Sequence, residues 1–367
     1  MTDAAPPAAA LALDIRLARA DFALEIALNL PARGITALCG PSGAGKTTLL
    51  RLIAGLESGA QGRIEFAGQC WQDSARAQFV PTHRRPIGYV FQEPRLFPHL
   101  TVQQNIDFAR RRALDAAARQ ADSADVVQLL GIEHLLARRV HTLSGGEQSR
   151  AAIARALAGA PRLLLMDEPL AALDAARKAE ILPWLERLCA HARVPILYVS
   201  HAHDEVARLA DYVVLIEGGK LRAHGAAQDM LARLDLSTAR GADAGVFIPA
   251  VFVEHDAQDC LSRFSFAGGE LFVPLAAPPA KAQQRIRIAA RDVSLALTRP
   301  EDSSIANRIA CTVTELADTD SPAHLLVRLD AGGAPLLARV TRRAARTLEV
   351  RPGQSVWAQV KAVALLD

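Results

Sequence analysis

A glycine-rich octapeptide with the spacing G-x-x-x-x-G-K-T is the first segment of this sequence that could do chemistry. Its residues are Gly40, Pro41, Ser42, Gly43, Ala44, Gly45, Lys46 and Thr47, with Thr48 after them. Glycines let backbone N–H groups close around phosphates, a lysine here can reach β and γ phosphates, and the Thr47 hydroxyl can hold Mg²⁺. An apolar run, Ile35–Cys39, precedes the segment and a helix-like stretch begins near Thr47. This context favours a phosphate-binding loop over a simple glycine-rich turn with a surface lysine.

A second apolar run, Leu163–Met166, ends in two adjacent carboxylates, Asp167 and Glu168. A buried strand places such residues at the C-terminal edge of a parallel sheet, where ligands bind in open α/β folds. We expect Asp167 to join the Mg²⁺ shell and Glu168 to orient or deprotonate the water that attacks the γ-phosphate. Taken alone, the pattern is often only a strand that runs into an acidic turn. Its pairing with Lys46 and Thr47 favours the catalytic interpretation.

The third motif, Leu143–Gln148, has the sequence LSGGEQ. Ser144 and Glu147 have the spacing of a capping box, which predicts a helix that begins near Gly145. The N–H groups of Gly145 and Gly146 would then be free to bind an anion at the helix N-terminus. An ordinary helix cap would need neither glycine.

Residues 11 to about 235, with these motifs in this order, resemble the ATP-binding subunits of ABC transporters. The resemblance implies ATP and Mg²⁺ as ligands and a head-to-tail homodimer, in which Ser144, Gly145, Gly146 and Glu147 complete the ATP site of the other subunit. It also implies that Gln92 is the Q-loop glutamine, at the metal and the attacking water, that Asp174 is the D-loop aspartate, and that His201 is the switch histidine near the γ-phosphate.

The assignment of His201, and a further one for Phe22, have simpler alternatives. His201 could belong to a helix cap, or form a metal-like pair with His203. Phe22 is the only aromatic residue among the first 65, which makes it the available platform for adenine stacking. A plain core role is the alternative for Phe22.

The elements that must position these residues follow from the hydrophobic pattern. Up to about residue 235, short apolar runs alternate with longer helix-like stretches, which predicts an α/β fold with a mainly parallel sheet covered by helices. Later residues form short alternating segments separated by Gly, Pro and Asp, which indicates small β-barrels. We therefore expect a P-loop ABC-type ATPase domain with a helical subdomain, followed by a β-rich, OB-like C-terminal region. The expected bounds are 1–236 for the ATPase domain, about 93–160 for its helical subdomain, 237–301 for a linker and first β-rich segment, and 302–367 for a small barrel.

The C-terminal part resembles the accessory region of molybdate importers, whose final small barrel is of the Mop/TOBE type. This resemblance rests on residues 285–295, on Ser304 and Asn307, and on Lys361. It implies that Ser304, Asn307 and Lys361 hold an oxyanion such as molybdate. The sequence departs from the family pattern at Ala306, where arginine is usual, and at Ala362, where serine is common.

Composition and charge narrow the function further. The 367 residues carry 42 Lys and Arg against 39 Asp and Glu, a net charge of +3, which gives no footprint for nucleic acid. The five cysteines are widely spaced and odd in number, which favours free thiols in a reducing compartment. No uncharged apolar run approaches the roughly 18 to 20 residues of a membrane span. We expect a peripheral protein at the cytoplasmic face of the inner membrane.

These inferences predict the energising subunit of a molybdate importer, a homodimer that drives two membrane permease subunits and is served indirectly by an external molybdate-binding protein. Import of sulfate, iron or a polyamine is the alternative within the class. A soluble ABC ATPase acting on DNA or ribosomes would favour a coiled coil or a basic stripe, and the chain shows neither. An oxyanion-storage module on an inactive ATPase would favour loss of Lys46, Asp167 or Glu168, and all three are present.

Overall fold

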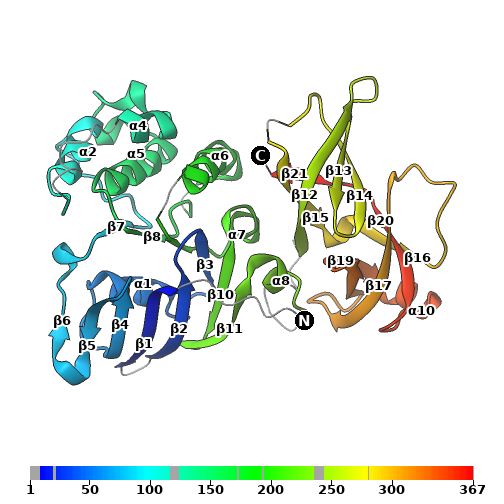
Figure 1. The fold of residues 1–367 in the computed structure, drawn as a ribbon, viewed down its shortest axis with the longest axis horizontal. Coiled ribbons are helices and arrows are strands. Elements are labelled where there is room, and N and C mark those ends of the chain that lie inside the picture. Colours follow the sequence, from blue (N-terminus) through cyan, green and yellow to red (C-terminus); the bar gives the residue numbers. More distant parts are fainter. Residues whose placement is uncertain are drawn as a thin grey trace. The chain divides into compact units, whose positions relative to one another are not determined.

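The structure is a computed structural model that describes residues 9–19, 22–115, 124–171, 173–191, 194–234, 244–279 and 281–366. The chain divides into two compact units, Met1–Gly225 and Ala226–Asp367 (Figure 1). The predicted fold class, an α/β ATPase part followed by a β-rich part, is confirmed. Among the described helices, none combines the length and the apolar character that crossing a bilayer requires.

The first unit is built on a sheet that has 11 strands within the described residues, in the order β6-β5-β4-β1-β2-β11-β10-β3-β9-β8-β7. The strands are β1 (Ala9–Arg19), β2 (Phe22–Pro31), β3 (Ile35–Cys39), β4 (Gln61–Phe66), β5 (Gln69–Asp73), β6 (Gln78–Phe79), β7 (Ile87–Val90), β8 (Leu163–Asp167), β9 (Ile196–Val199), β10 (Tyr212–Glu217) and β11 (Lys220–Ala226).

The sheet has an antiparallel part and a parallel part with different burial. From β6 to β2 the neighbours run antiparallel, whereas β10, β3, β9, β8 and β7 run parallel. Every residue of β3, β8 and β9 is buried, as expected for parallel strands covered on both faces. In β2, buried and exposed residues alternate, because one face of that strand is solvated. The parallel strands therefore bring the C-terminal ends of β3, β7, β8 and β9 to one edge of the sheet, next to its buried part.

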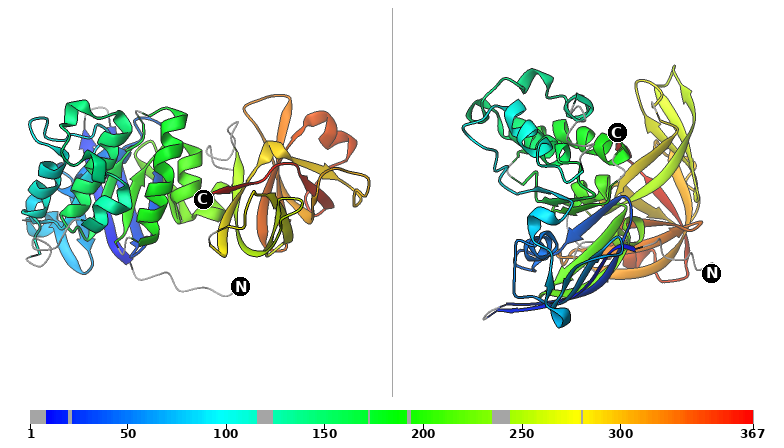
Figure 2. Two further views of the ribbon diagram at one scale, coloured as in Figure 1. Left: turned by 90° about the horizontal axis from the view of Figure 1, so that it is seen from above. Right: turned by 60° about the vertical axis from the view of Figure 1, so that its left-hand side comes forward.

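The helices of the first unit are α1 (Lys46–Ala54), α2 (Val102–Arg110), α4 (Ala124–Leu130), α5 (Gly145–Ala158), α6 (Ala175–His191) and α7 (His203–Leu209). Single turns of 3₁₀ helix occur at Ser74–Arg76, Thr82–Arg84, Glu133–Leu135 and Val140–Thr142. α2, α4 and α5 lie together at one side of the first unit in Figure 1 and in the right-hand view of Figure 2. Their apolar residues share a core with β8 and β9, and α5 packs on β7. Capping boxes open α2 at Thr101 and α5 at Ser144.

The second unit has two five-stranded sheets, in the orders β14-β13-β12-β15-β21 and β16-β20-β17-β18-β19. Its elements are α8 (Ala227–Leu231), β12 (Gly245–Asp256), β13 (Leu261–Phe266), β14 (Gly269–Pro274), β15 (Gln283–Ala289), a 3₁₀ turn at Ala290–Asp292, β16 (Val293–Ala296), β17 (Asn307–Asp318), β18 (His324–Ala331), β19 (Ala334–Thr341), α10 (Arg342–Thr347), β20 (Ser355–Val360) and β21 (Ala364–Leu366).

The two sheets of the second unit are interlocked. β16 follows strands of the first sheet in sequence but pairs with β20 of the second sheet. β21, at the end of the chain, pairs with β15 of the first sheet. Residues of both sheets, among them Phe264 and Leu336, belong to one hydrophobic core. The division into 237–301 and 302–367 remains a prediction, and the strand exchange across it was not anticipated.

Candidate nucleotide site

The functional side chains predicted from the first unit's strands converge at one edge of the sheet. The phosphate-binding loop follows β3, Gln92 follows β7, Asp167 ends β8 with Glu168 after it, and His201 follows β9. Because these four strands are parallel neighbours, their C-terminal ends lie side by side. The sheet thus assembles residues that are more than 150 positions apart in sequence.

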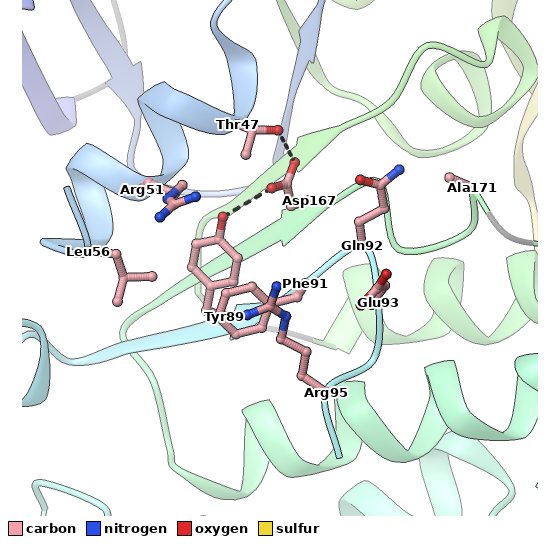
Figure 3. A pocket seen from close by; sticks show the side chains of 10 residues that line it. All are labelled: Thr47, Arg51, Leu56, Tyr89, Phe91, Gln92, Glu93, Arg95, Asp167 and Ala171. Carbon is pink, nitrogen blue, oxygen red and sulfur yellow. Dashed lines mark hydrogen bonds between the residues drawn. The ribbon is translucent and has the colours of Figure 1, made fainter. Parts of the chain in front are cut away.

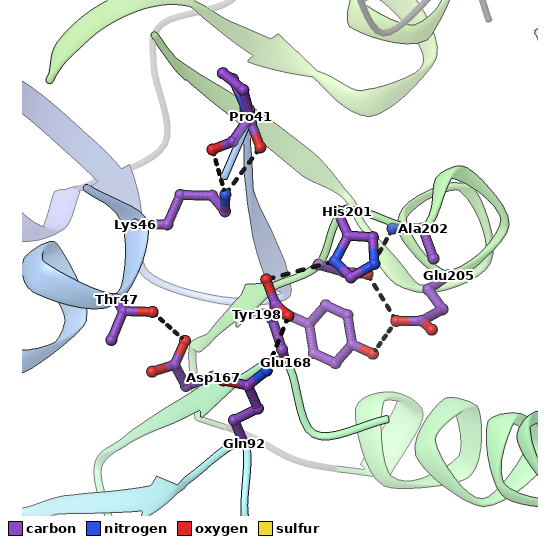
Figure 4. Close-up of polar contacts among 12 residues, drawn as sticks. Pro41, Lys46, Thr47, Gln92, Asp167, Glu168, Tyr198, His201, Ala202 and Glu205 are labelled. Carbon is purple, nitrogen blue, oxygen red and sulfur yellow. Dashed lines mark hydrogen bonds and ion pairs between the residues drawn. The ribbon is translucent and has the colours of Figure 1, made fainter. Parts of the chain in front are cut away.

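The loop Gly40–Thr47 is shaped by close packing and by an internal lysine. The Lys46 ammonium donates hydrogen bonds to the carbonyls of Gly40 at 2.8 Å and Pro41 at 2.9 Å, and the side chain is 6% exposed (Figure 4). Gly40 has a φ of 143°, and a Cβ there would lie 2.0 Å from the carbonyl oxygen of Ile216 in β10. Only glycine fits this approach of two backbones. The loop is therefore held against the sheet with its lysine directed inward.

Phe22 lies at the back of the loop. It is partly buried and packs against the core of the first unit. Its Cζ atom would be 2.6 Å from a Cβ at Gly45, so the ring is in direct contact with the loop. The ring therefore lies beside the phosphate-binding loop, and its stacking on adenine remains a prediction.

The Thr47 hydroxyl, in the first turn of α1, is hydrogen-bonded to the Asp167 carboxylate at the end of β8. Thr47 Oγ1 donates to Asp167 Oδ1 at 2.9 Å, and the Tyr89 hydroxyl donates to Asp167 Oδ2 at 3.2 Å (Figure 3). Asp167 is 5% exposed, and burial raises its pKa, with Glu168 adding to the rise, while the two hydrogen bonds and Lys46 lower it. Burial, together with the charge and hydrogen bond of Asp167, also raises the pKa of Tyr89. The pair offers a hydroxyl and a carboxylate oxygen, the ligand types that Mg²⁺ prefers.

A second cluster joins Glu168, His201 and Gln92. Glu168 Oε1 lies 3.4 Å from His201 Nδ1, and Gln92 Nε2 lies 3.5 Å from Glu168 Oε2 (Figure 4). Glu168 is partly buried and has a φ of 46°, an uncommon conformation for a residue other than glycine. Its N–H donates to the carbonyl of Val199 at 3.1 Å, which fixes the turn to the end of β9. The structure thus brings the three predicted catalytic residues together.

A cavity of about 720 Å³ opens beside these clusters (Figure 3). Its lining includes Asp167, Thr47 and Gln92, which the sequence predicted, and also Tyr89, Phe91 and Arg95, which it did not. The Tyr89 and Phe91 rings stack at 4.2 Å between centroids, and the Arg95 guanidinium lies 5.1 Å from the Phe91 centroid. The sequence signal that could have identified Tyr89 as a lining residue was its place as an aromatic residue in the strand just before Gln92.

The LSGGE segment and Asp174 form a second exposed feature of the same unit. Ser144 Oγ accepts from the Glu147 N–H at 3.3 Å, and the Ser144 N–H donates to Glu147 Oε2 at 2.7 Å, which confirms the predicted capping box. Burial opposes ionisation of Glu147, but the bonds to Ser144 and nearby arginines outweigh it and lower the pKa of the carboxyl. Ser144, Gly145 and Asp174 are exposed, and Gly145 lies against Leu173. Ala172, beside this turn, lies outside the described residues.

Comparisons with known proteins agree with this geometry. A family model described as ABC transporter matches residues 24–171, and one described as TOBE domain matches residues 303–366. The molybdenum import ATP-binding protein ModC 1 of Azotobacter vinelandii is 55% identical over 98% of this chain and 99% of that protein. The molybdenum import ATP-binding protein of Pseudomonas aeruginosa is 53% identical over 97% of this chain and 99% of that protein.

The chain belongs to the ABC transporter family. The structure of cbiO1 from Clostridium perfringens, part of the ABC transporter complex cbiONQ, matches with a TM-score of 0.53 and 27% identity over 61% of this chain and 91% of that chain. A nucleotide-free ATP-binding cassette from an ABC transporter matches with a TM-score of 0.50 and 22% identity over 59% of this chain and 91% of that chain, and shows the shared fold. As a member of this family, the chain is an ATP-binding subunit.

The residues predicted to hold an oxyanion lie within the segment that matches the TOBE domain. Asn307 is 5% exposed, and its amide accepts from the N–H of Phe272 at 2.6 Å and donates to the carbonyl of Phe272 at 2.9 Å. This pair of bonds joins β17 to β14 and so links the two sheets. Ser304 and Lys361 are exposed, and Asn307 stands opposite Val360, next to Lys361, in the strand register. The amide of Asn307 thus has a structural task, and an oxyanion role for the three residues remains a prediction.

Proposed function

We propose that this chain is the ATP-hydrolysing subunit of a molybdate importer. The observation that carries the proposal is the cluster of Glu168, His201 and Gln92 beside Lys46 and the Thr47–Asp167 pair, in a chain whose whole length is similar to molybdenum import ATP-binding proteins. The ABC family binds ATP with this loop, and the similarity of the second unit extends the likeness to the part that differs among importers.

The bound nucleotide is held by groups that the fold already orients. The loop leads directly into the start of α1, where N–H groups at a helix N-terminus can bind phosphate, and Lys46 adds a positive charge for the β and γ phosphates. Phe22, the first residue of β2, would supply a ring for the base from beside Gly45. Together these residues would hold the triphosphate of a bound nucleotide.

The residues near Asp167 fit a magnesium ion. The Thr47 hydroxyl oxygen and Asp167 Oδ1 lie 2.9 Å apart, and the buried carboxylate carries a raised pKa, a cost that a bound cation would offset. We assign Thr47 and Asp167 as holders of Mg²⁺, with Gln92 as the third contributor. When bound, the ion would neutralise charge on the phosphate oxygens.

Glu168 is assigned to the attacking water. Its Oε1 faces His201 Nδ1 and its Oε2 faces Gln92 Nε2, so the carboxylate is oriented from both sides. As a base it would accept a proton from the water, while the imidazole of His201 would donate a hydrogen bond to the γ-phosphate. The left-handed backbone at Glu168 is the kind of strain that persists where the surrounding structure fixes a functional residue.

Two copies are proposed to complete each other's sites. Gly145 and Gly146, in the first turn of α5, would offer N–H groups to the γ-phosphate held by the partner, with the Ser144 hydroxyl and Asp174 beside them. Closure of the homodimer on ATP would drive two permease subunits at the cytoplasmic face of the inner membrane, and hydrolysis would reset them. An external molybdate-binding protein delivers the ion. Ser304, Asn307 and Lys361 are proposed to contact molybdate in the second unit.

Molybdate uptake in cells tests the proposal. A strain that lacks its own importer ATPase but keeps the permease and binding protein would express this chain, and uptake of labelled molybdate would be measured with tungstate, sulfate or phosphate as competitors. We expect uptake that tungstate inhibits and sulfate does not. Uptake that sulfate abolishes, or restoration of sulfate, iron or polyamine uptake alone, would contradict the assignment.

A further inference from the structure

Glu205 is a buried carboxylate that the proposed reaction does not use. It lies in α7 and is 4% exposed. Its Oε2 accepts hydrogen bonds from the hydroxyls of Tyr198 and Ser200, each at 2.7 Å (Figure 4). Its Oε1 accepts from the ammonium of Lys178 at 2.7 Å. Hydrogen bonds to a charged group are stronger than those between neutral groups. The carboxylate therefore holds together the segments that carry Tyr198, Ser200 and Lys178.

One side of this cluster fixes the backbone around His201. Ser200 immediately precedes His201, and its hydroxyl both donates to Glu205 and accepts from the N–H of Ala202 at 3.0 Å. The residues on either side of His201 are therefore held by one hydroxyl, which is itself held by Glu205. The His201 side chain is 63% exposed, so its own packing does little to set its position toward Glu168.

The other side of the cluster leads to the exposed turn at Asp174. Lys178 lies in the first turns of α6, and its N–H donates to the Asp174 carbonyl at 2.9 Å. Asp174 Oδ1 accepts from the N–H of Arg177 at 2.9 Å, which is the arrangement of a helix N-cap. Asp174 and Lys178 are thus parts of one helical turn, and Glu205 is bonded to that turn through the Lys178 ammonium.

We propose that Glu205 is a positioning residue that couples the placement of His201 to the Asp174 turn through Lys178 and Ser200. The inference rests on the proposed role of His201. A second copy that presses on the Asp174 turn would move α6, and the buried contacts would pass that displacement to the backbone of His201. Hydrolysis would then depend on closure of the dimer at a point that touches neither the phosphates nor Glu168.

Three variants of the full-length protein test the relay. Lys178→Met combined with Glu205→Gln removes the ion pair without leaving a buried charge alone, and the amide oxygen of the introduced glutamine can still accept the two hydroxyls. Ser200→Ala removes the link to Ala202 and keeps the ion pair. The third variant joins all three changes. The readouts are kcat and KM for ATP, together with the thermal midpoint.

The control is Arg208→Met. Arg208 Nε pairs with Glu186 Oε1 at 2.5 Å, so this pair also fastens α7 to α6, but at the far end from the His201 loop. If the Lys178–Glu205 pair were only a fastener between two helices, Arg208→Met would reproduce its effect.

We expect the Lys178→Met/Glu205→Gln and Ser200→Ala proteins each to lose about 10- to 100-fold in kcat, the scale on which small misplacements act, with KM for ATP within about threefold of wild type. The kcat of the triple variant should be at most about threefold below that of the less active of these two proteins, because all the changes interrupt one path. Arg208→Met should keep kcat within about twofold. Multiplicative losses, an equal loss in Arg208→Met, or a wild-type kcat in Lys178→Met/Glu205→Gln would overturn the relay.

A His201→Ala protein separates this outcome from failure of the proposed function. If His201→Ala loses kcat but the relay variants do not, the relay alone is wrong. If His201→Ala retains wild-type kcat, the assigned role of His201 is wrong and the relay falls with it.

Discussion

Two glycines in the phosphate-binding loop should respond very differently to the same substitution. At Gly40, an added Cβ would lie 2.0 Å from the Ile216 carbonyl oxygen, far inside the roughly 3.3–3.6 Å of a tolerated carbon–oxygen contact. Both partners are backbone, and β10 is fixed beside β3, so no side-chain rotation relieves the overlap. At Gly43 the φ is 79°, and no atom lies within 4 Å of an added Cβ. Gly40→Ala therefore combines strain with overpacking, whereas Gly43→Ala has the strain alone.

The expected free energies of unfolding follow from these contacts. Backbone strain costs about 1–3 kcal/mol and overpacking about 1–3 kcal/mol at Gly40, against about 1–2 kcal/mol of left-handed strain at Gly43. The stiffer unfolded chain returns about 0.4–1 kcal/mol to both variants. The middle of these ranges gives net losses of about 3 kcal/mol for Gly40→Ala and about 1 kcal/mol for Gly43→Ala. For a unit of this size the difference corresponds to about 4–8 °C in thermal midpoint.

Thermal unfolding without nucleotide measures this difference. ATP stabilises the unit that binds it, so the transition that rises on ATP addition in the wild type identifies the first unit. In that transition, Gly40→Ala should unfold well below Gly43→Ala. Gly43→Ala should nevertheless bind ATP weakly, because its new methyl group would point into the space where the loop is expected to hold phosphate. Equal midpoints, or a larger loss in Gly43→Ala, would refute the packing argument.

Three further experiments test the chemistry. Glu168→Gln should bind ATP and form a lasting dimer by light scattering while releasing phosphate very slowly, because the amide keeps the shape and loses the base; near wild-type turnover would remove Glu168 from its role. Lys46→Ala and Ser144→Arg should each be inactive, and mixing them should restore ATPase activity, since a heterodimer concentrates both lesions in one site; a mixture no better than either variant argues against the composite site. Because burial raises the pKa of Asp167, its charged form destabilises the nucleotide-free fold above that pKa. Asp167→Asn should therefore raise the thermal midpoint at pH 8, with the gain vanishing as the pH falls toward the ordinary aspartate value of about 3.8, and a lower midpoint at pH 8 would contradict this.

The sequence predicted the arrangement of the parallel strands better than the remainder of the sheet. Uninterrupted apolar runs such as Leu163–Met166 are typical of strands buried on both faces, and the motifs at their ends had to meet at one edge. The antiparallel strands β4 to β6 were not anticipated, because β5 and β6 are short and contain polar residues. The exchange of β16 and β21 in the second unit depends on pairing between distant segments, which local patterns do not encode.

The candidate site was predictable where a motif fixes the residue type. Lys46, Glu168 and His201 stand in recognisable sequence contexts, whereas Tyr89 and Glu205 act through contacts between elements that only the folded chain creates. Asn307 shows the opposite difficulty. Its motif predicted a ligand, and the structure engages its amide with the backbone of Phe272. A short polar motif does not reveal which of its groups the fold itself will use.

Coupling of ATP hydrolysis to molybdate transport is the central claim, and proteoliposomes test it most directly. The chain would be reconstituted with its permease subunits, with ATP on the side of this chain and labelled molybdate with the binding protein on the other. Wild-type protein should accumulate molybdate while releasing phosphate, and Glu168→Gln should do neither despite binding ATP. Molybdate accumulation that continues in Glu168→Gln, or ATP hydrolysis by the wild type without any molybdate movement, would contradict the account.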